Sequence, residues 1–372
     1  MILTKKCYFF LFEISIIPIL TFIIVTIIYV NYTKKEIIVK LKNILTSLLL
    51  AVATFASASS ALQTETVVTF DNIRPANIAI SNKGRMFVTG HPIVGSTKKV
   101  VEISAVGSKN IYPNVKYSDS SVNDSIIKAT IGIRVDSKDN LWVLDMGAKQ
   151  FVLWDLKTNK LNKIIKIPSE VLTSTSFLQD FVLDEKRGRA IIADMTQADL
   201  KSTPTPAFVV VDINTGKATR VAESHSSMMP DFEGGFALNP IAIDPSFEWV
   251  YFGALNGKKV YRVKASKFDD VKTVAKNIEF YAPKSFSDGI KVDENQNVYI
   301  TDIENQAIGV SNKNGYKIIA RLPKGQSWPD GLEIKNEYVY AVVNQLNRIP
   351  ALNNGKDDTK GSFLIVKTPL VK

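Results

Sequence analysis

One supersecondary unit recurs six times along the chain: a short apolar strand, a turn rich in Asn, Asp, Gly and Lys, and a second apolar strand. The copies begin at residues 77, 131, 180, 239, 288 and 330. Each copy has the pattern of a β-hairpin, and the second copy continues into two further strands, at 150–156 and 161–167. Since four strands in about 50 residues make one propeller blade, we predict an all-β fold, a six-bladed β-propeller.

The two ends of the repeat region predict how the ring closes. Apolar strands lie at 66–70 and at 362–367. Pairing them in one blade would cover strand edges that are otherwise free, so we expect the N- and C-terminal strands to close the ring. A β-sandwich is the alternative, but it does not predict a sixfold recurrence. Nothing between the repeats has the 3.6-residue period of a substantial helix.

The segment before the repeats has the pattern of an export signal. In residues 39–61 a short basic stretch precedes an apolar core and a run of small residues, the layout of a signal peptide. We therefore expect a six-bladed propeller domain at 62–372 that is secreted or periplasmic, without membrane attachment of the mature domain. Residues 1–38 contain an earlier apolar stretch. We interpret it as an upstream extension of the reading frame, with a membrane segment as the alternative.

Composition excludes several classes of function. The single cysteine, Cys7, lies before the propeller, and His91 and His225 are the only histidines. A disulfide, a thiol nucleophile and a His-rich zinc site are therefore excluded in the mature domain. Part of the net charge of +10 lies in residues 1–61, and the remaining +6 is spread along the chain without a basic run, which argues against nucleic-acid binding. We expect a monomer whose partner is a small molecule.

Propeller geometry selects the candidate functional residues. The residues before the first strand and after the second strand of each blade share one rim of the central channel. The first set is Asn77, Asp180, Asn239, Asp288 and Asp330, and the second is Asp145, Asp194, Asp302 and Asn344. These side chains could bind a hard cation such as calcium, bind an amine, or cap blade turns.

Aromatic residues and one histidine map to the same rim. Trp328, Phe177 and Phe286 lie just before rim positions, where they could stack on a ligand or pack in the core. His91 follows the first hairpin, and a role in proton transfer is the least favoured reading. The predicted ligand-binding residues are Asp180, Asn239, Asp288, Asp330, Asn344 and Trp328. If Ca²⁺ is a cofactor, its predicted ligands are Asn239, Asp288 and Asp330.

Several segments resemble the major royal jelly and yellow proteins. They include 74–89, 141–147, 177–184, 328–332 and 344–348, and the similarity extends over nearly all of residues 66–368. The resemblance implies a secreted six-bladed propeller that binds small ligands in its channel in some members. Insect members are associated with melanin-pathway chemistry or amine binding. This chain departs from them because its mature part has no cysteine.

Three functions follow as hypotheses, and the sequence leaves catalysis open. The preferred one is a binding protein for a small aromatic or cationic ligand at the channel mouth. The second is a calcium-dependent lactonase, since gluconolactonase-type propellers resemble this architecture. Those enzymes have an acidic metal ligand in the first blade, whereas the matching stretch here is Arg74 to Asn77. The third is a yellow-like enzyme acting on catechol-derived compounds.

Overall fold

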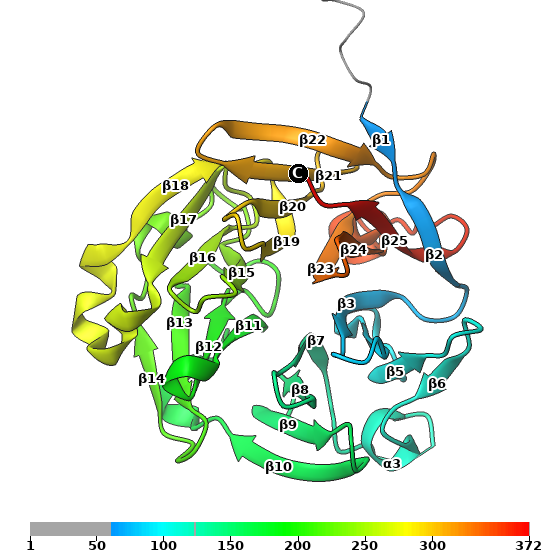
Figure 1. Cartoon of the computed structure of the whole chain (residues 1–372), viewed down its shortest axis with the longest axis horizontal. Coiled ribbons are helices and arrows are strands. Elements are labelled where there is room, and N and C mark those ends of the chain that lie inside the picture. The colour runs from blue at the N-terminus through cyan, green and yellow to red at the C-terminus, as the bar shows by residue number, and fades with distance from the viewer. Residues whose placement is uncertain (1–60, 123, 372) are drawn as a thin grey trace, which may run out of the picture. The chain divides into compact units, whose positions relative to one another are not determined.

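The computed structural model describes residues 61–122 and 124–371, which form six sheets arranged radially around a centre (Figure 1). The six-bladed propeller predicted from the repeats is confirmed. The segments interpreted as an upstream extension, 1–38, and as a signal peptide, 39–61, lie outside the described residues apart from Ala61, so those expectations stay predictions.

Each blade is a four-stranded antiparallel meander whose innermost strand is the first strand of its repeat, and in blade 6 the outermost strand comes from the N-terminal segment. Blade 1 contains β3 (Pro75–Ile80), β4 (Met86–Gly90), β5 (Val100–Ile103) and β6 (Lys109–Ile111). Blade 2 contains β7 (Thr130–Val135), β8 (Asn140–Asp145), β9 (Gln150–Asp155) and β10 (Lys160–Lys166). Blade 3 contains β11 (Leu178–Asp184), β12 (Arg189–Asp194), β13 (Ala207–Asp212) and β14 (Ala218–Val221).

The remaining blades follow the same plan. Blade 4 contains β15 (Leu238–Ile243), β16 (Trp249–Ala254), β17 (Lys259–Lys264) and β18 (Glu279–Pro283). Blade 5 contains β19 (Ser287–Val292), β20 (Val298–Asp302), β21 (Ala307–Asn312) and β22 (Gly315–Arg321). Blade 6 contains β23 (Pro329–Lys335), β24 (Tyr338–Val343), β25 (Phe363–Pro369) and, from the other end of the repeat region, β2 (Glu65–Phe70).

The ring closes as the sequence predicts. Strand β2 pairs antiparallel with β25 from Glu65 opposite Lys367 to Phe70 opposite Phe363. A short strand, β1 (Leu62–Gln63), adds in parallel to β22, the outermost strand of blade 5. The sequence did not predict this second attachment. Together the two pairings join the N-terminal segment to blade 5 and blade 6 (Figure 1).

Every innermost strand carries a β-bulge near its start. In each blade the pairing register shifts after the first residue of that strand, so two residues of the inner strand stand opposite one residue of the second strand. In blade 5, for example, Ser287 pairs with Asp302 and Ile290 pairs with Ile300. The bulge puts one extra residue at the same place in all six blades and therefore sets which side chains are equivalent.

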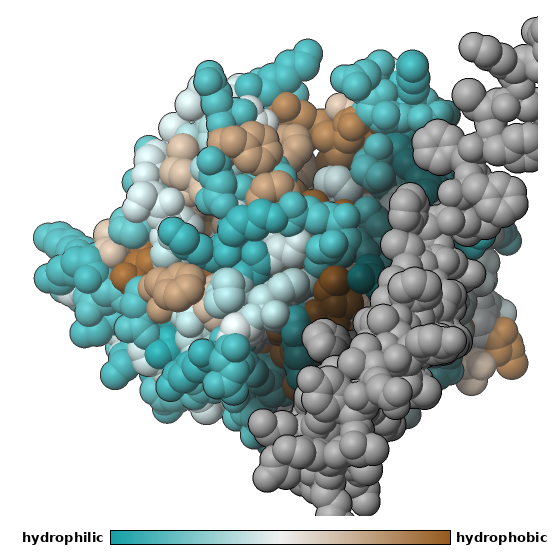
Figure 2. All heavy atoms as spheres, turned by 90° about the horizontal axis from the view of Figure 1, so that it is seen from above, coloured by the Kyte–Doolittle hydropathy of each residue, from teal (hydrophilic) through white to brown (hydrophobic). Residues whose placement is uncertain are grey.

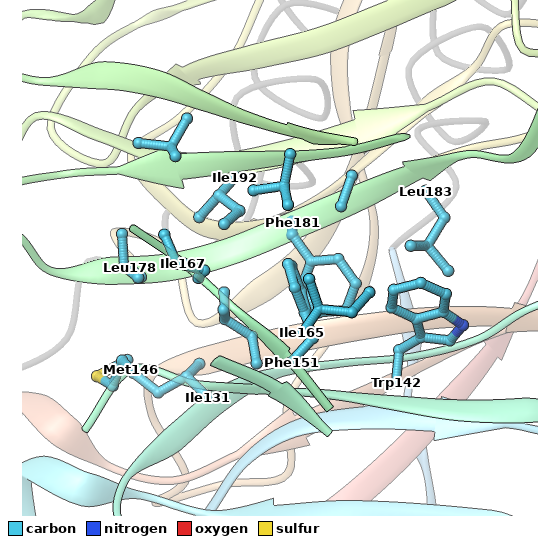
Figure 3. Packing of buried hydrophobic residues seen from close by; sticks show 14 of the residues in the cluster. Ile131, Trp142, Met146, Phe151, Ile165, Ile167, Leu178, Phe181, Leu183 and Ile192 are labelled. Carbon is cyan, nitrogen blue, oxygen red and sulfur yellow. The ribbon is translucent and has the colours of Figure 1, made fainter. Parts of the chain in front are cut away.

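The hydrophobic core lies between neighbouring blades. Figure 3 shows the cluster that joins blade 2 to blade 3, where Phe151 and Phe181 meet edge to face with ring centroids 4.9 Å apart. Ile131 and Ile192 are buried in the same cluster. Alternating residues of the inner strands thus hold adjacent sheets face to face, as the period of two in each repeat requires.

Helical structure is sparse in the described part of the chain. It contains one α-helix of a single turn, α3 (Val115–Ser118), and otherwise only short 3₁₀ turns. No helix among these residues has the length and apolar character needed to cross a bilayer. The face seen in Figure 2 is mainly hydrophilic, with hydrophobic residues scattered between polar ones.

Candidate functional site

The starts of three innermost strands meet at one end of the channel. The Asn239 Nδ2 group donates a hydrogen bond of 2.9 Å to Oδ1 of Asp288, and the Gln179 Nε2 group donates to the same oxygen at 3.3 Å. These residues come from blades 4, 5 and 3, and each is the second residue of its strand. The predicted convergence of Asn239 and Asp288 is therefore what the structure shows.

Backbone geometry holds Asp288 in place. The hydroxyl of Thr301, on β20 opposite the bulge of β19, accepts hydrogen bonds from the backbone N–H groups of Asp288 at 3.2 Å and Gly289 at 2.8 Å. A Cβ atom on Gly289 would lie 2.3 Å from the carbonyl oxygen of Asp330 in the next blade. Glycine is required there because the two inner strands approach more closely than a side chain permits.

Trp328 binds the other oxygen of Asp288. Its indole Nε1–H donates a hydrogen bond of 2.7 Å to Oδ2. The backbone of Trp328 has a φ of 56°, in the left-handed region that a bulky residue rarely adopts. Its own N–H donates to the side chain of Gln306 at 3.0 Å. The strained backbone places the indole over the site, as is common for residues with a functional constraint.

Asp330 has a separate set of partners. Its Oδ2 accepts a hydrogen bond of 2.6 Å from Asn344 Nδ2 and lies 3.7 Å from Nε2 of His91. The Asn344 carbonyl in turn accepts a hydrogen bond from Arg74, which lies 4.3 Å above the ring of Phe363. The predicted residues Asp330 and Asn344 are thus in contact, and both are buried.

Burial dominates the electrostatics of this group. It raises the pKa of Asp288 to about 6, with nearby Asp180 adding to the effect and the Trp328 and Asn239 hydrogen bonds opposing it. Burial, followed by repulsion from Asp288, raises the pKa of Asp330 well above its ordinary value. Burial, followed by repulsion from Arg74, lowers the pKa of His91 to about 3, so the imidazole is neutral near pH 7.

The prediction that the first set of rim residues occupies equivalent positions is wrong, because of the bulge. Asn239, Asp288 and Asp330 are the second residues of their strands, whereas Asn77 and Asp180 are the third. One position along a strand turns the side chain to the opposite face. Asp180 accordingly forms an ion pair with Arg134 and accepts the N–H of Phe181 at 2.9 Å. A repeat alignment by sequence could not locate the extra residue within each copy.

Most of the second predicted set caps turns. Asp145 accepts backbone N–H groups from Lys128, Ala129 and Ala148. Asp302 accepts those of Glu304 and Asn305. Asp194 does the same for Phe177 and Thr196 and also pairs with Arg220. For these three acids the turn-capping alternative is the one the structure supports.

A narrow pocket lies over Asn239, Asp288 and Trp328, and we call it the channel-mouth pocket. It encloses about 30 Å³, close to the liquid volume of one water molecule. The remaining lining residues are mostly apolar and, apart from Gln179 on β11, lie in the segments between strands: His91, Ile93, Phe177, Gln179, Met195, Leu200, Phe236, Leu255, Leu346 and Leu352. The structure places Phe177 and His91 in this lining, as the sequence suggested.

Other residues of the prediction lie elsewhere. Asp180, Asp330 and Asn344 do not line the pocket, although Asp330 is electrostatically coupled to Asp288. Phe286 stacks beneath the Lys258 ammonium group, 4.0 Å from its ring centroid, outside the lining. Sequence reasoning missed the apolar walls, because loop residues carry no periodic signal, and it missed Gln179 on β11, because the position of the bulge was unknown. The position of Gln179, directly before Asp180, was the available clue once the bulge was known.

Comparison with known sequences decides the family. The sequence model described as "Major royal jelly protein" matches residues 128–370, more than half of the chain. The chain belongs to the major royal jelly protein family. Two similar proteins of Apis mellifera are major royal jelly protein 9, 23% identical over 70% of both chains, and major royal jelly protein 3, 23% identical over 68% of this chain and 54% of that protein.

Two solved structures are also similar to this family member. A gluconolactonase from Xanthomonas campestris superposes with a TM-score of 0.53 at 11% identity, covering 84% of this chain and 98% of that one. Virginiamycin B lyase from Staphylococcus aureus gives a TM-score of 0.46 at 13% identity, covering 82% and 88%. At such identities the gluconolactonase similarity establishes the fold alone.

Proposed function

We propose that this chain is an exported binding protein that holds a small organic cation at the channel mouth, with Asp288 as the counter-ion. The observation that carries the proposal is the bonding of Asp288. Among the residues that the structure describes, the carboxylate accepts hydrogen bonds only from the neutral side chains of Gln179, Asn239 and Trp328. It accepts none from a backbone N–H among the described residues, so it does not serve as a turn cap.

Asp288 also lacks a cationic partner, whereas some other buried acids have one. Asp180 pairs with Arg134, and Asp184 pairs with Arg189 at 3.0 Å. Within residues 61–122 and 124–371, no lysine or arginine forms an ion pair with Asp288, and none is among the main causes of its pKa shift. Because a buried carboxylate is costly without compensating charge, a bound cation supplies what the protein does not.

The surroundings of Asp288 favour an ammonium group attached to an apolar body. The free space of about 30 Å³, close to the volume of one water molecule, admits an ammonium group, and the lining loops must move apart to admit the rest of the ligand. The indole of Trp328 and the ring of Phe177 line the same pocket and provide faces for cation–π contact. The loop residues of the wall are apolar and suit the remainder of the ligand. The signal-peptide pattern in residues 39–61 supports export.

Calorimetric titration with 2-phenylethylamine and its neutral analogue 2-phenylethanol tests the proposal. We expect the amine to bind at pH 7.5 at least about tenfold more tightly than the alcohol, and Asp288→Asn to remove that preference. Asp124→Asn is the matched control, because the Asp124 side chain is 89% exposed. Equal affinity for both probes, or an unchanged preference in Asp288→Asn, contradicts the proposal.

A calcium-dependent lactonase is the second candidate. It is favoured by the Asn239 Oδ1 atom, which is buried without a hydrogen-bond partner in the described part of the chain, beside Asp288. At the equivalent bulge position blades 1 and 2 carry Ala76 and Ile131, which have no ligating oxygen. No group of three or more His, Cys, Asp or Glu side chains in the described residues is arranged to hold a metal.

The side chains alone do not complete a calcium site, and water or ligand oxygens would have to supply the rest. Calcium takes about six to eight oxygen ligands, whereas Asn239, Asp288 and Asp330 offer carboxylate and amide oxygens from only three blades. Titration with CaCl₂ in parallel with a lactone panel separates the candidates. Tight calcium binding that Asp288→Ala abolishes, together with lactone turnover, would favour the lactonase.

A further inference from the structure

A second and larger pocket lies at the opposite end of the innermost strands. It encloses about 620 Å³, within the range of roughly 300–1,000 Å³ typical of small-molecule sites. Its floor is formed where β15, β19 and β23 end, at Ile243, Val292 and Ile334. Since the starts of the same strands surround Asp288, this far-face pocket is separate from the channel-mouth pocket.

Apolar side chains and one ion pair line the far-face pocket. Ile243, Phe247, Ile334 and Leu370 are only partly buried there. At the base, Lys291 Nζ lies 3.2 Å from Glu333 Oε1, and both side chains retain some exposure, 17% and 16%. An apolar wall with a few convergent charged groups is the usual composition of a ligand pocket.

The backbone of Phe247 is an independent indication. The turn between the first two strands of each blade contains a residue with positive φ, and glycine takes this place in blade 1 (Gly84, 81°) and blade 3 (Gly188, 62°). Blades 2, 5 and 6 have polar residues there, Asp139 at 66°, Gln296 at 62°, and Asn336 and Glu337 at 48° and 63°, whereas blade 4 has the aromatic Phe247 at 58°. Glycine adopts this conformation without steric cost, whereas phenylalanine does not. A strained aromatic residue on the wall of a pocket points to a functional constraint.

The charges around the pocket favour a cation. Glu294, Glu333 and Glu337 line it, against the single ammonium group of Lys291, which Glu333 already pairs. Two further lining acids, Asp244 and Asp293, accept backbone N–H groups of their turns. The excess of carboxylates gives the cleft a negative potential, and the ring of Phe247 can contact a cation through its face.

We propose that the far-face pocket is a second ligand site, which binds an organic ammonium compound with an apolar body between Phe247 and Glu333. The apolar part of the ligand packs on Ile243, Ile334 and Leu370, and its ammonium group is held by Glu333 and Glu337. The inference does not depend on the function proposed for the channel mouth, because the two pockets share no lining residue.

The experiment uses the propeller carrying Asp288→Asn, so that the channel-mouth pocket does not contribute. Calorimetric titration compares 4-phenylbutylamine with 4-phenylbutyrate, which has the same apolar body and the opposite charge. We expect one site per chain that prefers the amine. Glu333→Gln should weaken amine binding at least about tenfold. No binding of the amine, or tighter binding of the carboxylate, overturns the proposal.

Phe247→Gly separates a ligand contact from a structural role. Glycine suits the left-handed backbone, so we expect the unfolding midpoint to stay within about 3 °C of the parent while amine affinity falls at least about tenfold. Phe232→Ala is the matched control, since Phe232 is a 50% exposed aromatic residue outside this pocket. Unchanged affinity in Phe247→Gly, or an equal loss in Phe232→Ala, refutes the site.

Discussion

Trp328 and Asp288 are 40 residues apart in the chain, yet the indole N–H of one donates a 2.7 Å hydrogen bond to the carboxylate of the other across two blades. This contact joins a strained backbone to a buried acid that no cation of the described residues neutralises. The hydrogen bond favours the ionised form of Asp288, because it lowers a pKa that burial raises. The pair therefore controls the charge of the channel-mouth pocket.

Trp328→Phe should weaken cation binding, because it removes a hydrogen bond that favours the ionised form of Asp288. Phenylalanine keeps an aromatic face but donates no hydrogen bond, and such a bond to a charged group contributes roughly 1.5–3 kcal/mol. We expect the affinity for 2-phenylethylamine at pH 7 to fall about tenfold and the pH at which binding is half-lost to rise. Calorimetry from pH 5 to 9 measures both. A loss of affinity with an unchanged pH midpoint would assign Trp328 a stacking role alone.

Asp288 should make the protein less stable as pH rises from about 4 to 6. Its pKa is about 6 in the folded state and 3.8 ordinarily, so in this window the folded state binds more protons than the unfolded state. The stabilisation by protonated Asp288 is complete below pH 4 and is lost as pH passes 6. Urea unfolding at pH 4, 5, 6 and 7 measures the trend.

Asp288→Asn should flatten this dependence, with a difference of roughly 1–3 kcal/mol between the variant and the parent across the same pH range. Asp330 is coupled to Asp288 and titrates in the same direction, so the residual slope in the variant reports Asp330. If the parent and the variant show the same slope, the carboxyl group of Asp288 is not buried as the structure has it.

Gly331→Ala should destabilise the junction of blades 6 and 1. The added Cβ would lie 2.1 Å from Oδ1 of Asn77 and 2.6 Å from its Cα. Because overpacking against backbone typically costs about 1–3 kcal/mol or more, we expect a clear fall in the free energy of unfolding. Shortening the neighbour with Asn77→Ala should not restore it, since the backbone at position 77 would still obstruct the new methyl group. Rescue by the double variant would show that only the side chain conflicts.

Ile365→Ala should test the closing blade. Ile365 is fully buried on β25, opposite Val68 of β2. Removing a buried isoleucine side chain costs about 2–5 kcal/mol, and here the loss falls on the pairing that joins the two ends of the repeat region. Val67→Ala is the control, because Val67 is 38% exposed and should lose less than about 1 kcal/mol. Equal losses on chemical unfolding would contradict the role of β25 as the closing core strand.

The sequence by itself determined the fold and the ends of the ring. The six hairpins, their further strand pairs and the closure of 66–70 on 362–367 were predictable, because alternating apolar residues and turn chemistry are local signals. The same pattern placed Asn239, Asp288 and Trp328 near one rim. This prediction required only the assumption that all innermost strands begin at the same face of the propeller.

Only the tertiary structure decided which polar side chains are available to a ligand. Counted from the start of its inner strand, Asp180 lies one position later than Asp288. This offset depends on how the bulged inner strand pairs with the second strand rather than on composition. Whether an acid caps a turn, as Asp302 does, or stays without a cationic partner, as Asp288 does, depends on groups from other blades. The far-face pocket beside Phe247 likewise arises where the ends of separate strands meet. Such contacts join residues tens of positions apart, and a local pattern carries no record of them.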